Sequence, residues 1–571
     1  MISSRRTITI SATRDPALYG GTLKKRGGKG KKILLFLFAP FLILFFLFLT
    51  NENFSQGLKF RLNELELRYD TFSISFSNTV PTELGQEIES RLIDIEHNGK
   101  KRFVFVEDAS DIEIGLVEEE YAIFTDHLIP VGHFYWLKNS LESEKIYDKE
   151  IVVSEENYDL VRSVLEKHFD SELSIVKVDD VLSYLEENED SSISFLTLED
   201  LDFKYQILYF DDKYFLDDFD GGIAFYTGIK INAAPEFLVN IIKESTQDIY
   251  ESTHFDEILK VNMSGVTAIS RNLAFEIEAS GNPAYPAEYI ADFLGDADLV
   301  HTSNEVSFVP GCKPERSMRF CSHPSYIETL DAINANVIEL TGNHNNDFGS
   351  EYNTQTIEMY KERGWGYYGG GLNTEDAQEI LFEEVKDSKI AFIGYNYYDS
   401  IHNFHANLAG ENRAGANSFS FEKMKNDIKQ ANEQDALTIV TFQFEECWSY
   451  PPNDVIYPPC YKPLSNPDQR QVFRTAIDYG ADIVIGSQAH QPQTYEIYDG
   501  KPIFYGTGNL FFDQIYWIGT RQGMILSHYI HDGRLLQSKI TTTLYDDDMR
   551  PYVTTGEDRD LLLRLLREAR D

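Results

Sequence analysis

Cysteine is scarce in this chain, and the few cysteines lack the spacing of a zinc ribbon. The 571 residues include four, Cys312, Cys321, Cys447 and Cys460, and no two of them form a CxxC pair. All four lie in the C-terminal half, where they predict two loop-closing disulfides in an oxidising compartment. Cys312 with Cys321 and Cys447 with Cys460 are the local pairings, but the spacing leaves all three possible connectivities open.

Basic side chains are outnumbered over most of the chain. The sequence has 51 Lys and Arg against 93 Asp and Glu, which gives a formal net charge of −42. Nine of the basic residues fall within residues 1–32, beside a single acid, so the rest of the chain carries a net charge of −50. Such an acidic body repels phosphate groups, which argues against nucleic acid and against an anionic lipid surface as its partner.

Long apolar runs are absent except for one. Residues 33–49 carry no charge, and Pro40 is their only helix-disfavouring residue. A run of this length is at the short limit of a membrane-spanning helix, which needs roughly 17 to 25 residues. Thr50–Asn53 offers no small-x-small cleavage site, which disfavours the alternative of a cleaved signal peptide. We therefore expect a membrane anchor, with the basic N-terminus in the cytoplasm and the bulk of the chain outside it.

The remaining composition is that of a globular protein. Apolar residues make up 42% and aromatic residues 13% of the chain, which is enough to bury sizeable cores. Because 571 residues exceed the size of a single core, we expect two or three domains.

Residues 51–253 alternate strand-like and helix-like segments. Arg102–Val106 and Ile193–Leu198 have the composition of strands, and Tyr158–Phe169 has the apolar spacing of an amphipathic helix. Such alternation predicts an α/β domain. The order of these elements, together with residues 111–115 and 121–123, resembles the periplasmic solute-binding protein fold. The resemblance implies a cleft for a small ligand, and the alternative is a spacer domain that has kept the fold and lost the ligand.

The C-terminal half contains several strand-like runs that end in short polar loops. Ligands of α/β folds collect at such strand ends, so these loops are the candidates for a functional site. The segments are 261–271, 298–305, 337–349 with a predicted helix at 351–363 after it, 438–446, and 481–490 with 502–513 after it.

Three motifs in these segments resemble the CapA family of capsule synthesis proteins. They are Gly-Asn-His-Asn-x-Asp-x-Gly at 342–349, Gly-Ala-Asp-Ile-Val-Ile-Gly at 480–486 and Gly-x-Gly-Asn-Leu-x-Phe-Asp at 506–513. The resemblance covers about residues 255–520 and implies a calcineurin-like metallophosphatase fold, an α/β sandwich, and a link to poly-γ-glutamate capsules. The predicted organisation is a basic cytoplasmic tail at 1–32, a transmembrane helix at 33–50, a solute-binding-like α/β domain at 51–253, a CapA-like domain at 254–555 and a C-terminal helix at 556–571.

The resemblance also implies a metal site. Oxygen and imidazole ligands suit manganese, iron or zinc, which activate water for hydrolysis. The implied catalytic pair is His344, as proton donor, with Asp347 orienting it. The full sets are Glu305, Asn343, His344 and His490 as metal ligands, His344, Asp347 and His490 as catalytic residues, and Asn304, Gln443, Glu446, Gln488 and Asn509 as substrate-binding residues.

Several positions depart from the family pattern. Val266 follows Gly265 where the family has an aspartate. Gln443 stands where the family has a histidine, and Ser487 and Gln488 replace two histidines of the last loop. One carboxylate and two or three imidazoles are missing, which argues against a two-metal phosphatase. We expect one weakly bound metal or none.

Two functions agree with these observations. The first is a membrane-anchored CapA-like protein for biosynthesis, export or remodelling of an extracellular polymer, with residual metal-dependent hydrolase activity. The second is a non-catalytic protein that binds a ligand, the polymer or its precursor outside the cytoplasm. An acidic cleft repels a polyanion, so local basic residues are expected to take part. The candidates are Arg271, Arg316, Arg319 and Arg413.

Overall fold

The computed structural model describes residues 71–570, except 98–99, 108, 235–236, 248, 250–256, 403–405 and 445–466. The predicted tail at 1–32 and the predicted anchor at 33–50 lie outside these residues. Within the described ranges, no helix is both long and apolar enough to span a bilayer.

The chain divides into two compact units. Unit 1 comprises Met1–Phe72 and Asp94–Val104, and its described part includes the antiparallel pair β2 (Glu96–His97) and β3 (Lys100–Lys101). Unit 2 comprises Ser73–Ile93 and Phe105–Asp571. It holds nearly all of the elements of both predicted α/β regions.

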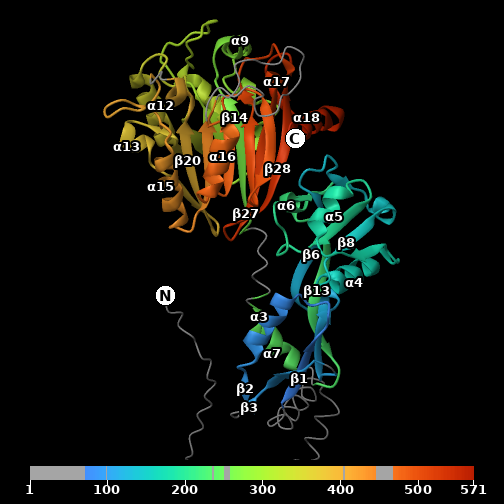
Figure 1. The fold of residues 1–571 in the computed structure, drawn as a ribbon. Helices are drawn as coiled ribbons and strands as arrows, with labels where there is room; N and C mark the ends of the chain where they lie inside the picture. Colours follow the sequence, from blue (N-terminus) through green and yellow to red (C-terminus); the bar gives the residue numbers. More distant parts are fainter. Residues whose placement is uncertain are drawn as a thin grey trace, which may run out of the picture. The chain divides into compact units, whose positions relative to one another are not determined.

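The N-terminal region of unit 2 is built on one mixed sheet, with the strand order β1-β5-β13-β6-β10-β8-β9. Two long strands, β6 (Ala122–His133) and β13 (Ile223–Ile231), run through its centre (Figure 1). The first part of β6 pairs with β13 and its last part pairs with β10 and β11, so β6 connects two lobes. The other elements are β1 (Phe72–Phe76), α3 (Thr82–Leu92), β5 (Ile112–Leu116), β8 (Glu150–Val153), α4 (Tyr158–Phe169), β9 (Ile175–Lys177), α5 (Val181–Glu187), β10 (Ser192–Leu196), β11 (Tyr205–Ile207) and α7 (Phe237–Ser245).

The elements predicted in this region are present. Helix α4 has the predicted bounds, because its four buried apolar residues recur at helical spacing. The strand predicted at Arg102–Val106 is the shorter β4 (Phe103–Phe105), and the strand predicted at Ile193–Leu198 is β10, Ser192–Leu196. The predicted mixed α/β class is confirmed.

The C-terminal region is a sandwich of two sheets (Figure 1). One sheet runs β17-β16-β15-β14-β27-β28-β29, with β26 paired to β14, and the other runs β19-β20-β22-β23-β25-β24. Its strands are β14 (Leu259–Thr267), β15 (Leu299–Asn304), β16 (Val337–Glu339), β17 (Gly366–Tyr368), β19 (Leu381–Val385), β20 (Ser388–Asn396), β22 (Leu437–Gln443), β23 (Ile483–Ser487), β24 (Pro492–Tyr498), β25 (Lys501–Thr507), β26 (Asn509–Phe511), β27 (Gln522–His531), β28 (Arg534–Tyr545) and β29 (Pro551–Val553).

Helices cover the outer faces of both sheets. The first sheet packs against α9 (Arg271–Ser280) and α12 (Ser350–Arg363), and the second against α15 (Phe421–Asn432) and α16 (Gln469–Asp478). Every residue of β22 and β23 is buried, as expected of parallel strands covered on both faces. The predicted C-terminal helix is α18 (Gly556–Glu568), and it buries Leu562, Leu563 and Leu566 in the core between the sheets.

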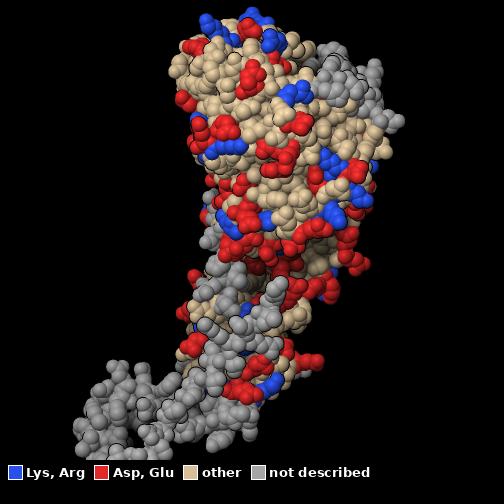
Figure 2. All heavy atoms as spheres, turned by 90° about the vertical axis from the view of Figure 1, so that its left-hand side faces the viewer, with Lys and Arg blue, Asp and Glu red and all other residues tan. Residues whose placement is uncertain are grey.

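The acidic composition is visible at the surface. Figure 2 shows Asp and Glu side chains over much of the face drawn there, with basic side chains gathered along its upper edge. Some acids pair with basic residues, as Asp217 and Asp296 both do with Lys260. Basic groups are therefore local features of an acidic surface.

Candidate functional site

The predicted site loops meet at one edge of the sandwich. Strands β14, β15, β16 and β26 run in parallel in the first sheet, as do β22 and β23 in the second. Thr267 pairs with Asn304 at the ends of β14 and β15, and Gln443 pairs with Ser487 at the ends of β22 and β23. Carboxyl ends of parallel strands share an edge, which is where α/β folds bind ligands.

Glu305 is the most unusual side chain at this edge. It is fully buried, and neither carboxylate oxygen has a hydrogen-bond partner among the described residues. Burial raises its pKa to about 7, although the nearby His344 acts in the opposite direction. Gly342 packs directly on it, since a Cβ there would come within 2.3 Å of the Glu305 Cβ. A buried carboxylate without partners is costly and leaves acceptors for a ligand.

His344 and Asp347 form a hydrogen-bonded pair. His344 Nδ1 lies 2.7 Å from Asp347 Oδ2, which also accepts a hydrogen bond from the Phe320 N–H at 2.8 Å. Burial alone lowers the pKa of His344, but the hydrogen bond to Asp347 and the charge of Glu305 outweigh it and raise that pKa. The pair therefore favours a protonated, positively charged imidazole.

The pKa of His490 is shifted in the direction opposite to that of His344. It is buried, and this burial lowers its pKa to about 4. Asn509 orients the ring, because its Nδ2 donates to the backbone oxygens of His490 and Thr520, which turns its Oδ1 toward His490 Nδ1 at 2.9 Å. The proton of the neutral ring therefore lies on Nδ1, and Nε2 is an acceptor.

An amide cluster occupies the neighbouring positions. Gln443 Nε2 donates to Gln488 Oε1 and, at 3.2 Å, to Asn343 Oδ1. Ser487 Oγ donates to Gln443 Oε1 at 3.3 Å. Gln488 and His490 both have a left-handed backbone, with φ of 80° and 54°, which is strained for these residue types. The residues that replace the expected histidines are thus engaged with one another.

The residues present do not fit a two-metal centre. Asn343 Oδ1 accepts from Gln443, and Gln443, Ser487 and Gln488, at positions where the resemblance implies histidines, bond to one another. Across the described ranges, no group of three or more His, Cys, Asp or Glu side chains is arranged to hold a metal ion. The metal set of Glu305, Asn343, His344 and His490 remains a prediction.

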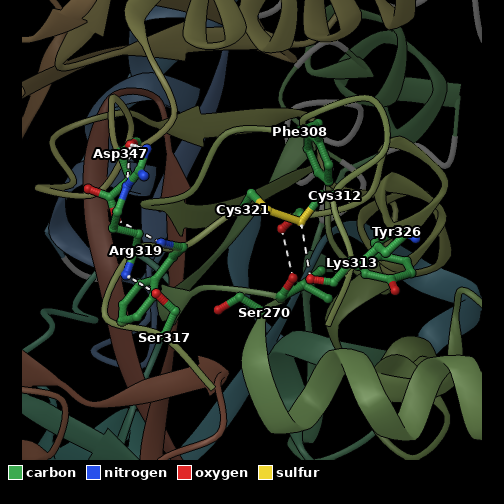
Figure 3. Close-up of a disulfide and its surroundings, with 12 residues drawn as sticks. Ser270, Phe308, Cys312, Lys313, Ser317, Arg319, Cys321, Tyr326 and Asp347 are labelled. Carbon is green, nitrogen blue, oxygen red and sulfur yellow. Dashed lines mark hydrogen bonds between the residues drawn. A yellow bond between two sulfur atoms is a disulfide. The ribbon is translucent and has the colours of Figure 1, made fainter. Parts of the chain in front are cut away.

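A disulfide-closed loop covers His344. Cys312 and Cys321 are bonded, so the local pairing is present, while Cys447 and Cys460 lie outside the described residues. Figure 3 shows Arg319 of this loop directed at Asp347, whose backbone oxygen accepts from Arg319 Nε at 3.1 Å and Nη2 at 2.6 Å. The Phe320 ring stacks on His344 with centroids 4.0 Å apart.

The C-terminal half matches a known family. Residues 260–514 match the family model described as bacterial capsule synthesis protein PGA_cap. This confirms the resemblance to the CapA family. The capsule biosynthesis protein CapA of Bacillus anthracis is 22% identical over 322 residues, which cover 54% of this chain and 73% of that protein.

Two further relatives have the same character. The PGA biosynthesis protein CapA of Bacillus subtilis (strain 168) is 23% identical over 282 residues, covering 49% of this chain and 69% of that protein. A probable polyglutamine synthesis accessory protein of Mycobacterium tuberculosis (strain CDC 1551 / Oshkosh) is 25% identical over 197 residues, covering 33% of this chain and 48% of that protein.

Matches to solved structures are weaker. An ABC-type phosphate transport receptor from Vibrio cholerae matches with a TM-score of 0.25 and 13% identity, over 32% of this chain and 96% of that one. A putative phosphate ABC transporter substrate-binding protein from Clostridium perfringens matches with a TM-score of 0.24 and 12% identity, over 32% of this chain and 98% of that one. Scores this low carry no weight, so the solute-binding likeness of residues 51–253 stays a prediction.

Most residues predicted for the CapA-like site lie together. Contacts or mutual charge effects connect a single cluster, made of Glu305, Asn343, His344, Asp347, Gln443, Gln488, His490 and Asn509. Asn304 is buried apart from these contacts, because its amide donates to Val306 O at 3.0 Å and Tyr360 Oη at 2.6 Å. Glu446 lies outside the described residues.

Two contributors to the CapA-like site, Asp513 and Asn272, were missed from the sequence. Asp513 accepts from Arg271 Nε at 2.9 Å, and the Arg271 guanidinium lies over Phe320 and Phe512 at 4.7 and 4.9 Å. Asn272 donates to the same Asp513 carboxylate. The available signal was the position of Asp513 at the end of the third CapA motif.

A hollow lies in the N-terminal region. It has a volume of about 480 Å³ and lies between the turn from β1 to α3 and the start of α4. Its small polar residues include Ser77, Thr79 and Asn157, and its acids include Glu89 and Glu156. This volume is in the range of small-molecule sites, roughly 300 to 1,000 Å³.

Proposed function

We propose that this protein serves in the biosynthesis, export or remodelling of an extracellular polymer of the poly-glutamate type. We propose further that its CapA-like site acts by binding that polymer. The similarity of residues 260–514 to capsule synthesis proteins supports the role. Three expected metal ligands are replaced by Gln443, Ser487 and Gln488, which bond to one another, and this supports binding over two-metal hydrolysis.

The buried carboxylate of Glu305 is the observation that carries the proposal. Its two oxygens have no partner among the described residues, so the site offers acceptors to a ligand that brings N–H donors. The amide N–H groups of a poly-glutamate backbone are such donors. His344 is in the same cluster, and its pKa is raised by Asp347 and Glu305, so its second ring nitrogen, Nε2, suits a carbonyl oxygen of that backbone as a donor.

Binding of labelled poly-γ-glutamate to the full-length protein tests this proposal. We expect saturable binding without shortening of the polymer, and a Kd about tenfold higher in Glu305→Gln or His344→Ala, the loss of one or two strong hydrogen bonds. Replacing exposed Glu557 by Gln serves as the control and leaves Kd unchanged. No binding, or metal-dependent cleavage that His344→Ala abolishes, would refute the binding role.

We also propose that residues 33–50 anchor the protein, with the following residues outside the cytoplasm. The uncharged run at 33–49 behind nine basic residues supports this. Full-length protein is expected in the membrane fraction, with its C-terminal part accessible to protease added to intact, wall-stripped cells. Recovery of a soluble, N-terminally shortened protein would contradict it.

A second candidate function is solute binding by the N-terminal region. The hollow of about 480 Å³ between two lobes that share β6 supports it. Native mass spectrometry of the purified protein is expected to detect a small polar molecule that Asn157→Trp, which fills the hollow, displaces. Identical spectra for both proteins, without a ligand, would favour the spacer role.

A further inference from the structure

The loop closed by Cys312 and Cys321 concentrates positive charge on an acidic protein. It contains Lys313, Arg316 and Arg319 against one acid, Glu315, whereas the whole chain has a formal net charge of −42. The side chains of all three basic residues are exposed. On the face drawn in Figure 2, several basic side chains lie along the upper edge, and most of the acidic ones lie below it together with other basic ones. An anion that approaches this protein meets repulsion except at such local patches.

The two arginines are held in place by contacts that leave donors unused. Arg319 donates through Nε and Nη2 to the backbone oxygen of Asp347, and its guanidinium lies 4.6 Å from the centre of the Phe348 ring. Arg316 donates through Nε to Asn272 Oδ1 at 2.9 Å. None of these partners is a carboxylate, so these contacts do not neutralise the positive charge of either guanidinium group.

Arg271 differs from these two. Its guanidinium is paired with the buried carboxylate of Asp513 and stacked against Phe320, so its charge is already compensated. We therefore assign Arg271 to the support of the loop, through Phe320, and not to the contact with a ligand.

The loop is fixed next to the CapA-like site at several points. The disulfide joins its ends, Phe320 stacks on His344, and the Phe320 N–H donates to Asp347. Figure 3 shows the disulfide and Arg319 on the same short segment. Fixing a loop before binding reduces the entropy lost when a ligand binds. Arg316 and Arg319 are thus presented in a preorganised arrangement beside His344.

We propose that this loop is a carboxylate-binding rim, in which Arg316 and Arg319, assisted by Lys313, hold the side-chain carboxylates of an acidic polymer while its backbone contacts the neighbouring site of His344. The inference rests on the proposed function and adds the residues that let an acidic protein bind a polyacid. A guanidinium binds a carboxylate through paired N–H donors, which a lysine cannot reproduce.

Fluorescence anisotropy of labelled poly-γ-glutamate with the full-length protein tests the rim. Arg316→Gln with Arg319→Gln is expected to raise Kd about tenfold and to weaken the dependence of Kd on salt, because two charge contacts are lost. Arg316→Lys with Arg319→Lys keeps the charges and is expected to restore only part of the affinity. The matched control, Arg162→Gln with Lys167→Gln, removes two exposed charges from helix α4 and is expected to leave Kd within twofold.

A second variant removes the disulfide that closes the loop and keeps the loop's charges. Cys312→Ser with Cys321→Ser is expected to raise Kd about threefold and to leave the salt dependence as in the wild type. Circular dichroism of each variant monitors its fold.

The outcomes separate the rim from the proposed function. Wild-type binding that the Arg316 and Arg319 variants do not weaken would overturn the rim and leave the function standing. Absence of binding by the wild type would overturn the function itself. Equal affinity for polyphosphate, with the same losses in the variants, would identify a general anion site and overturn the specificity for carboxylates.

Discussion

The two α/β regions of this chain differ in how far the polar side chains at their strand ends are buried. The N-terminal hollow is lined by small polar side chains and exposed acids, such as Ser77 and Glu156. The CapA-like edge buries titratable groups, among them Glu305 and His490. Burying such groups costs free energy, and perturbed groups of this kind cluster at functional sites. The contrast favours the CapA-like region as the place of the candidate chemistry, and solute binding by the other region stays a proposal.

The largest effect in this comparison is expected from adding a methyl group at Gly342, where the CapA-like site is tightly packed. Gly342→Ala would bring a Cβ within 2.4 Å of the Glu305 Cα, and backbone atoms cannot move away easily. We expect a loss of about 3 kcal/mol in the free energy of unfolding, together with loss of polymer binding. Urea denaturation measures the first. An unchanged midpoint would mean that Glu305 is not packed on Gly342.

The next largest effect is expected from removing Asp347. Asp347→Ala deprives His344 and the Phe320 N–H of their shared partner, and we expect about 2 to 3 kcal/mol of destabilisation. The pKa of His344 should fall, because the hydrogen bond that raises it is gone. NMR titration of the ring measures this, and Asp558→Ala, on the exposed start of α18, is the control. A His344 pKa equal to that of the wild type would contradict the pairing.

The N-terminal region has a buried acid of its own, which sharpens the comparison. Burial raises the pKa of Asp126 to about 7 from 3.8. Between pH 4 and 7 the unfolded chain loses this proton and the folded chain keeps it, so stability falls as pH rises. Asp126→Asn removes this contribution, and we expect its stability relative to the wild type to increase by about 3 kcal/mol over that range. Denaturation at several pH values measures the difference, and a constant difference would show that Asp126 ionises normally.

The smallest effect is expected at a glycine of the N-terminal hollow. Gly85 lies in helix α3, and a Cβ there would meet its nearest neighbour at 3.8 Å, an ordinary contact. Gly85→Ala should therefore stabilise the protein by about 0.5 to 1 kcal/mol through helix propensity. The sign is opposite to that expected for Gly342→Ala. Destabilisation in thermal unfolding would show that the hollow is packed more tightly than its volume indicates.

Sequence reasoning located the elements whose signal is periodic and local. Helix α4 was predicted to the residue, and the loops at 342–349 and 506–513 were assigned to one site through the resemblance of their motifs to the CapA family. Contacts between distant segments were beyond this reasoning. Arg271 and Asp513 are 242 residues apart, and no local pattern pairs them. The bonding of Gln443 to Gln488 likewise depends on the meeting of β22 and β23.

Strand β27 has a practical consequence for anyone who excises this domain. The family match ends at residue 514, yet β27 pairs with β14 in the middle of the first sheet, from Leu259 opposite Ile530 to Met263 opposite Leu526. A fragment trimmed to the matched region would lose this strand and the leucines of α18, leaving the inner faces of the sheets open to water. Transplanting the CapA-like domain into another protein therefore requires the chain through Glu568.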